Sequence, residues 1–249
     1  MYQAGLVSIS FRKLTAEQII AAAKDADLSC IEWGSDVHAP CDDLAKVSAV
    51  AAATQAAGLT CCSYGTYFYL GETPISQLSD YIAAAKLLGT DILRLWCGKK
   101  STCQYTPEEA EALYAVCREA AAIAEQENVT LCMECHPNTY TEELGGALAL
   151  MQAVDNPHFR MYWQPNQYRT EAEKLAYAQG IAPYVKHIHV YQWKGKEHFP
   201  LSGGIDQWQK YLSHFSGDHC LLLEFMPNHI VEELPAEAEA LRRIIGGTL

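Results

Sequence analysis

The sequence of 249 residues is poor in basic side chains and has no long apolar runs. Lys and Arg number 18 against 30 Asp and Glu, which gives a net charge of −12. A surface that binds a nucleic-acid duplex needs a basic footprint, so nucleic acid is not expected as a partner. No segment approaches the roughly 18–20 apolar residues of a membrane span, so no membrane partner is expected either.

Paired cysteine motifs and a signal-peptide pattern are also missing. The ten cysteines include one C-x-x-C, formed by Cys132 and Cys135, which has no second C-x-x-C to pair with. A zinc finger is therefore excluded. The first residues, MYQAGLVSISFRKL, lack a basic region followed by an apolar run. We expect a cytoplasmic protein whose cysteines are reduced and behave as small, buried hydrophobic residues.

The sequence does contain a regular alternation of two kinds of segment. Thr15 to Gln18 fits a helix capping box, and Gly58 and Gly89 follow two helix-like segments. Eight alternations in one chain predict an α/β fold, a (β/α)8 TIM barrel, with residues 1–249 as a single domain. The strand-like segments are 4–11, 29–34, 59–67, 91–98, 129–137, 159–166, 185–193 and 219–227, and the helix-like ones are 15–26, 42–58, 76–89, 106–127, 141–154, 170–181, 204–215 and 232–247.

A doubly wound open sheet is the alternative architecture, since it also alternates strands and helices. Such sheets that bind dinucleotides carry a glycine-rich phosphate loop after the first strand. The corresponding segment here, SISFRKLT, contains no glycine. The closed barrel is therefore the favoured prediction.

Polar residues stand at the ends of four consecutive strand-like segments, where a TIM barrel places its chemistry. They are Glu134, Gln164, His189 and Glu224. Two carboxylates, one imidazole and one amide oxygen suit Mn²⁺, Co²⁺ or Mg²⁺. A buried carboxylate without a partner is very costly, and two of them would repel each other unless a cation lies between them. We predict a metal or catalytic site, although a hydrogen-bonded core histidine and a strand-capping amide are ordinary alternatives for His189 and Gln164.

Further side chains near the strand ends are candidates for substrate binding, and each has a structural alternative. His136 either binds a substrate hydroxyl or supports Glu134. Arg94 either holds the substrate or forms a salt bridge in the barrel mouth, and His187 shares a strand face with His189. Trp163 offers an aromatic face to a sugar or closes the core. The full set of candidates is His38, Arg94, His136, Trp163, Gln167 and His187.

Six motifs together resemble those of the sugar phosphate isomerase/epimerase superfamily, the xylose-isomerase-like TIM barrels. They are CIEWGSDVH, LRLWCG, MECHP, YWQPN, VKHIHV and LLLEF, and the resemblance covers essentially the whole chain. It implies that Glu134, Gln164, His189 and Glu224 bind a divalent metal, Mn²⁺ before Co²⁺, Mg²⁺ or Zn²⁺. Gln164 departs from the Asp that is common there, so the ion should be more electrophilic and more weakly held. Gln167 stands where related barrels often have a His, which argues against a second metal.

The resemblance implies an isomerase or epimerase acting on a small sugar, keto sugar or polyol, in a barrel that often forms homo-oligomers. A carbon next to a carbonyl is weakly acidic, and a metal can stabilise the enediolate that forms when its proton leaves. Glu134 and Glu224 are the expected acid/base pair. Two alternatives stay open: a lyase or dehydratase acting on a keto sugar or glycoside with the same site, and a metal-free sugar-binding barrel.

Overall fold

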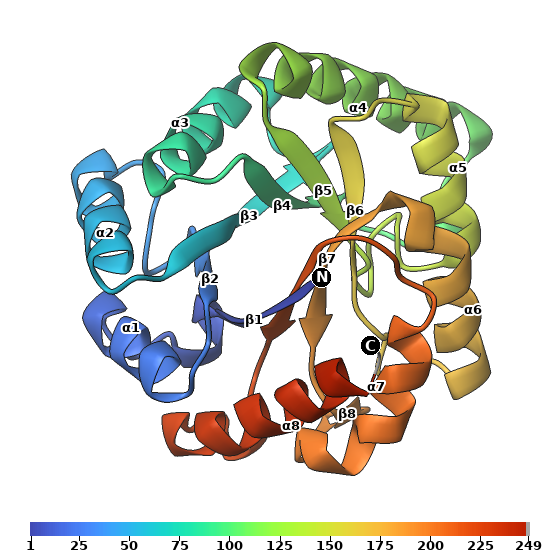
Figure 1. The fold of residues 1–249 in the computed structure, drawn as a ribbon. Coiled ribbons are helices and arrows are strands. Elements are labelled where there is room, and N and C mark those ends of the chain that lie inside the picture. Colours follow the sequence, from blue (N-terminus) through green and yellow to red (C-terminus); the bar gives the residue numbers. More distant parts are fainter. Residues whose placement is uncertain (248–249) are drawn as a thin grey trace.

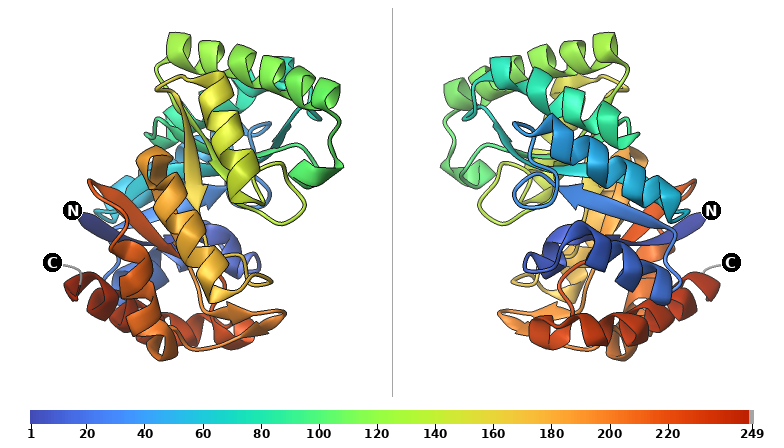
Figure 2. Two further views of the ribbon diagram at one scale, coloured as in Figure 1. Left: turned by 90° about the vertical axis from the view of Figure 1, so that its right-hand side faces the viewer. Right: turned by 90° about the vertical axis from the view of Figure 1, so that its left-hand side faces the viewer.

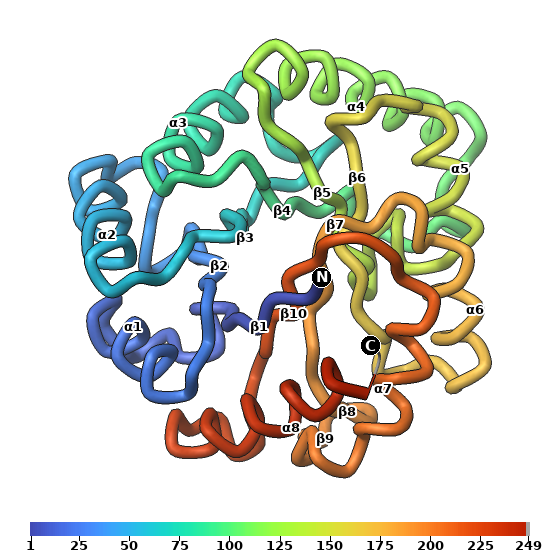
Figure 3. Tube along the Cα trace, viewed as in Figure 1, coloured from blue at the N-terminus to red at the C-terminus, as the bar shows by residue number. Residues whose placement is uncertain are grey.

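The computed structural model describes residues 1–247 and contains a closed barrel of eight parallel strands (Figure 1). The strands follow one another around the barrel in chain order, as the Cα trace shows (Figure 3). Because β1 pairs with both β2 and β10, the barrel prediction is confirmed and the open sheet is excluded. The barrel strands are β1 (Tyr2–Val7), β2 (Cys30–Gly34), β3 (Thr60–Leu70), β4 (Ile92–Cys97), β5 (Thr130–Glu134), β6 (Phe159–Trp163), β7 (Val185–Val190) and β10 (His219–Leu223).

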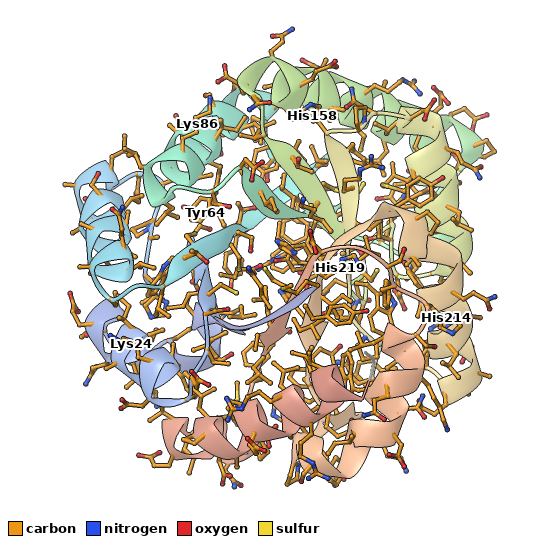
Figure 4. The ribbon with its side chains drawn as sticks, in the orientation of Figure 1. Lys24, Tyr64, Lys86, His158, His214 and His219 are labelled. Carbon is orange, nitrogen blue, oxygen red and sulfur yellow. The ribbon has the colours of Figure 1, made fainter. Side chains whose placement is uncertain are left out.

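Within residues 1–247, eight α-helices form a ring outside the strands, and their ends follow the sequence signals. The Thr15 side chain and Gln18 make the predicted capping box of α1, and Gly89 ends α3 in the left-handed conformation at φ +79°. In the stick view, Lys24 and Lys86 lie on this outer ring (Figure 4). The helices are α1 (Ala16–Asp25), α2 (Leu44–Ala56), α3 (Leu78–Leu88), α4 (Pro107–Glu127), α5 (Leu144–Val154), α6 (Glu171–Ile181), α7 (Ile205–Leu212) and α8 (Leu234–Gly246).

Strand alternation divides the buried residues into two layers. Side chains such as Leu93, Leu131 and Leu221 face the helices and belong to the large outer core. Their neighbours in sequence point inward and fill the barrel. The rest of the barrel interior is mainly apolar, with Val7, Ile92, Tyr162 and Leu222 among its members. Polar residues of the same inward rows therefore meet at the upper end of the barrel.

The first strand is shorter than predicted, because the segment that was expected to reach Phe11 ends at Val7. Residues Ser8–Phe11 form a 3-10 turn. Two serine hydroxyls in this turn accept hydrogen bonds from backbone N–H groups: Ser8 Oγ from Gly34, and Ser10 Oγ from Phe225. These side chains compete with regular strand pairing, and the turn carries the chain across the barrel mouth.

A small antiparallel hairpin, β8 (Trp193–Lys194) with β9 (Glu197–His198), projects from the chain after β7. The side views place the start of β1 and the end of α8 at the same end of the barrel (Figure 2). Among the described residues, no helix is both long enough and apolar enough to cross a membrane.

Candidate active site

The four predicted metal-binding side chains meet at the upper end of the barrel. They come from β5, β6, β7 and β10 or the residue just after, and these strands are neighbours in the barrel. Around His189 Nδ1 lie Gln164 Oε1 at 3.2 Å, Glu134 Oε1 at 3.4 Å and Glu224 Oε2 at 3.6 Å. All four side chains are buried. We call Glu134, Gln164, His189 and Glu224 the upper quartet.

A second group of buried charges supports the upper quartet from below. Glu32 Oε1 lies 3.3 Å from His189 Nε2 and 3.5 Å from Arg94 Nε. Arg94 Nη1 in turn lies 3.0 Å from Glu134 Oε2. Ser63 Oγ donates a 2.6 Å hydrogen bond to the second oxygen of Glu32. The chain Glu32–His189 fixes which imidazole nitrogen faces the quartet, as a carboxylate beside a metal-binding histidine commonly does.

The charges shift the pKa values of these groups in different directions. Burial opposes the charge on Glu32, but His189 and Arg94 outweigh it and lower the pKa of Glu32 to about 2. Glu134 is also buried, and Arg94 and His189 hold its pKa well below the ordinary value. Burial raises the pKa of Glu224, helped by the nearby Glu134. Burial disfavours the charged form of His189, yet Glu224 and Glu32 raise its pKa to about 10.

The upper quartet fits a divalent cation by the chemistry of its donors. One ligand atom each from Glu134, His189 and Glu224 all lie within 4.8 Å of one another, and the Gln164 carbonyl oxygen joins them. The Gln164 amide donates to Cys135 O at 3.1 Å, so its oxygen is the atom turned to the group. Three oxygens and one imidazole nitrogen suit a hard or borderline ion such as Mn²⁺. A cation here would offset the carboxylates that otherwise gather around one imidazole.

A cavity of about 210 Å³ opens above the upper quartet. This volume is below the range of roughly 300–1,000 Å³ for pockets that hold drug-sized ligands, so it suits a small molecule. The polar side chains are held in place: Arg12 pairs with Asp36 at 2.7 Å and donates a hydrogen bond to the Tyr67 hydroxyl. The wall also includes Ile9, Tyr67, Trp96, His136, Gln167, Tyr191, Trp193 and Phe225.

Three of the predicted substrate-binding residues line this cavity: Arg94, His136 and Gln167. Arg94 is only 1% exposed, and its guanidinium is engaged by two carboxylates. The His136 ring lies 5.4 Å from the Trp96 ring, and its Nδ1 is 2.8 Å from the Pro137 carbonyl oxygen. These residues form the floor and one wall of the cavity.

The structure places the other three predicted residues away from the cavity. The ring nitrogens of His38 lie 3.2 Å from Ser8 Oγ and 3.1 Å from Leu14 O, so both have protein partners. His187 lies one inward position below His189, where its Nδ1 accepts the Cys220 N–H at 3.0 Å.

Trp163 packs on the outer face of β6, against the rings of Trp208, Tyr211 and Phe215. It borders a separate cavity of about 280 Å³ between the barrel and α6. Strand alternation accounts for this placement: because Tyr162 and Gln164 point inward, the residue between them points outward.

Two functional candidates escaped the sequence analysis. Glu32 is fully buried and contacts both His189 and Arg94. Its signal was available, because CIEW places a carboxylate in an apolar strand just as LCMEC does at Glu134. Arg12 lines the cavity from the turn that follows β1. Arg12 could not be singled out from the sequence, because it directly follows the segment that was predicted as the first strand.

The fold and the site together define a class of protein. The chain belongs to the xylose isomerase-like TIM barrel family, whose model matches residues 20–244. It is 22% identical over 191 residues to a 3-dehydroshikimate dehydratase from Bacillus anthracis, covering 68% of each chain.

Solved structures of similar fold include enzymes with different reactions. The probable 3-DHS dehydratase AsbF of Bacillus anthracis matches with a TM-score of 0.82 at 19% identity, covering 97% of this chain and 99% of that one. The 3-keto-D-glucoside 4-epimerase YcjR of E. coli matches with a TM-score of 0.71 at 10% identity, covering 99% of this chain and 100% of that one. At these identities the likeness extends to the fold, while the relatives range from a dehydratase to an epimerase.

Proposed function

We propose that this protein is a divalent-metal-dependent isomerase or epimerase of a small sugar, keto sugar or polyol. The observation that carries the proposal is the pair of glutamates around His189 Nδ1, with Glu134 Oε1 at 3.4 Å and Glu224 Oε2 at 3.6 Å. The pKa of Glu134 is lowered and that of Glu224 is raised. Two carboxyl groups whose pKa values are pushed apart are suited to serve as base and acid in one reaction.

Each glutamate then has a defined role. Glu134 is ionised beside Arg94, and its carboxylate accepts the proton from the carbon next to the substrate carbonyl. Glu224 holds a proton more readily, and it delivers that proton to the same carbon from the other side. A proton taken from one face and returned to the opposite face inverts the carbon, which is an epimerisation. For a substrate of the opposite handedness, the two glutamates exchange roles.

The remaining residues of the upper quartet bind and orient. Glu134, Gln164, His189 and Glu224 would hold the cation, and Mn²⁺ is the ion we favour for three oxygens and one nitrogen. When bound, a divalent cation supplies a Lewis acid that polarises the substrate carbonyl. Gln164 contributes no charge, so the quartet would neutralise a bound cation less than it would with a third carboxylate at this position.

The cavity walls fit a small polyhydroxylated substrate. The aromatic residues Trp96 and Trp193 line it and can pack against C–H faces, while His136, Gln167 and Arg12 offer hydrogen bonds to hydroxyl groups.

Dehydration is the second candidate, and two observations favour it. The curated relative of Bacillus anthracis is a dehydratase. In addition, the His136 ring lines the cavity beside Glu134, where an imidazole can protonate a departing hydroxyl. Proton abstraction by Glu134 would be shared with the epimerase, and only the fate of the resulting anion would differ.

Proton exchange in D₂O tests the proposal. Keto sugars and related ketones are incubated with Mn²⁺-loaded protein, and NMR follows deuterium entering the carbon next to the carbonyl. Glu134→Gln should abolish both exchange and epimerisation. Glu224→Gln should keep exchange on one face but lose inversion, because only the return of the proton is blocked.

The matched control is Glu237→Gln, which makes the same change at a buried carboxyl of α8 outside the barrel. It should leave exchange unchanged. Exchange followed by loss of water would assign the dehydratase. Absence of exchange in every ketone tested, together with absence of Mn²⁺ binding, would overturn the proposal and leave a sugar-binding barrel.

A further inference from the structure

Three cysteines converge inside the barrel, one layer of side chains below the upper quartet. The sulfurs of Cys30 on β2, Cys62 on β3 and Cys220 on β10 all lie within 4.8 Å of one another. Cys30 and Cys220 are buried and Cys62 is half-buried. The Cys220 thiol lies within hydrogen-bonding reach of the other two. The preceding residue, His219, faces the other way, with its ring against those of Tyr2 and Phe215. We call Cys30, Cys62 and Cys220 the thiol triad.

A glycine makes the space in which two of these sulfurs approach each other. Gly5 on β1 pairs with Cys30 on one side and with Leu222 on the other. A Cβ at Gly5 would lie only 2.5 Å from the Cys30 sulfur, closer than real Cβ atoms approach. Because Gly5 has no side chain, the Cys30 sulfur can reach over β1 toward Cys220 on β10.

A β-bulge turns the third cysteine into the barrel. The register between β2 and β3 runs from the pair Ile31–Cys61 directly to the pair Glu32–Ser63, so Cys62 is an extra residue. Ser63 points inward, since its hydroxyl bonds Glu32. Cys62 also packs with the inner cluster, so two consecutive side chains face the barrel axis. Bulges re-aim side chains in this way, and here the bulge completes the triad.

The backbone positions do not permit a disulfide within the triad. Neighbouring strands lie about 4.8 Å apart, so Cys30 and Cys220, which are separated by β1 and offset by two residues along it, have Cα atoms more than about 9 Å apart. Cys30 pairs with Thr60, two residues before Cys62, which puts those two Cα atoms about 8 Å apart. A disulfide needs Cα atoms no more than about 7 Å apart. The three sulfurs can share a central atom but cannot bond to one another without moving the barrel strands.

We infer that the thiol triad binds a thiophilic metal cation of the Zn²⁺ or Cu⁺ class. Zinc–sulfur bonds of about 2.3 Å in a tetrahedral site place the sulfurs about 3.8 Å apart, so a small closure of the triad suffices. Soft thiolates select soft cations, whereas the oxygens of the upper quartet select harder ones. Each thiol that binds gives up its proton to solvent. The ion would join the last barrel strand to β2 and β3 across β1.

The route to the triad runs through the lower end of the barrel. Gln3 is exposed there, and its side-chain oxygen lies 3.6 Å from the Cys220 sulfur. The Gln3 side chain therefore lies between the Cys220 sulfur and solvent. The triad is thereby reached from the end of the barrel opposite the proposed substrate cavity, so the two sites can be loaded independently.

Cadmium NMR on the reduced, chelator-treated full chain tests this inference, because the resonance moves strongly downfield with each thiolate ligand. Titration with Cd²⁺ should give two resonances, one from the upper quartet and one in the thiolate region. Cys62→Ser and Cys220→Ser should each lose the thiolate resonance alone. Glu134→Gln should affect only the other. The matched control is Cys117→Ser, which alters a buried cysteine whose sulfur lies 3.7 Å from that of Cys97 in the outer core.

The inference is wrong if the wild-type chain shows no thiolate resonance, if that resonance persists in Cys62→Ser or Cys220→Ser, or if it disappears in Cys117→Ser. Should the serine variants fail to fold by circular dichroism, alkylation mapping of the wild-type chain decides the question. Cd²⁺ should then slow alkylation of Cys30, Cys62 and Cys220 and leave the exposed Cys103 unaffected. Equal alkylation of the triad with and without Cd²⁺ would also refute the site.

Discussion

Replacing Glu32 by glutamine should weaken binding of Mn²⁺ by about 10- to 100-fold. Glu32 touches no part of the cavity, but its Oε1 lies 3.3 Å from His189 Nε2 and 3.5 Å from Arg94 Nε. Glutamine has the same shape and no charge, so His189 loses the anion that orients it and makes it a stronger ligand. Loss of such a supporting partner typically costs 10- to 100-fold in metal affinity, about 1.4 to 2.7 kcal/mol.

The gross electrostatic change is larger than this expected effect. At an effective dielectric constant of about 20, a charge pair at 3.5 Å is worth about 5 kcal/mol. Most of this lost attraction is offset because the variant avoids the cost of burying a carboxylate charge at this position. Arg94 also keeps its 3.0 Å contact with Glu134. The variant should therefore fold, and the loss should be visible in the affinity for the ion.

Isothermal titration with Mn²⁺ measures the effect, with thermal unfolding as a check on the fold. Glu237→Gln is the matched control, because Glu237 is also a buried carboxyl, and its two oxygens accept the Leu201 N–H, at 3.2 and 3.1 Å. An unchanged affinity in a folded Glu32→Gln variant, or an equal loss in the control, would refute the role assigned to Glu32.

Three other side chains give separate tests. Gln164→Ala should weaken Mn²⁺ binding about tenfold, whereas Gln164→Glu should tighten it by a similar factor. Gln164→Glu should also lower kcat, because its negative charge opposes the charge that develops on the substrate. Isothermal titration measures the affinities, and steady-state kinetics measures kcat. Burial raises the pKa of Glu237 to about 7 from 4.5, so its contribution to stability is complete below pH 4.5 and is lost as the pH rises through about 7. Urea unfolding should show that the free energy of unfolding falls by about 1 to 2 kcal/mol across this pH range, a figure that allows for screening by solvent. Glu237→Gln should abolish this fall, and an unchanged fall in that variant would reject the assignment. Trp163→Phe should lower the free energy of unfolding by about 1 to 3 kcal/mol, since Trp163 packs against Trp208, while KM stays the same; a changed KM would place Trp163 in substrate binding.

The barrel and the upper quartet could both be predicted from the sequence. The alternation of strand-like and helix-like segments specified the fold, because each helix must bury an apolar face against the sheet. Glu134 and Glu224 stood out because carboxylates in apolar strand ends need a partner. The closed barrel then brought the ends of β5, β6, β7 and β10 together, which is a property of the fold and not of any single motif.

The remaining features depend on details that strand-level patterns do not carry. Strand alternation predicts that Trp163 and Gln164 point to opposite faces of the sheet. Glu32 could be predicted as a site residue because it is a carboxylate in an apolar strand, as Glu134 is. The partners of His38, by contrast, come from the turn after β1, whose geometry depends on serine hydrogen bonds to distant backbone groups. The bulge at Cys62 is likewise invisible in the sequence, because it changes only the register between two strands.

The ring of charges around His189 would make cation binding an exchange of protons for the ion. Glu32, Glu134 and Glu224 supply three carboxylates and Arg94 one guanidinium, so two negative charges remain to be balanced. A divalent cation balances them completely. Without it, the raised pKa values of His189 and Glu224 favour protons at those two positions. Uptake of an ion would therefore displace the proton of His189 first, so its affinity should rise with pH, and a proton kept on Glu224 would stay available for the substrate.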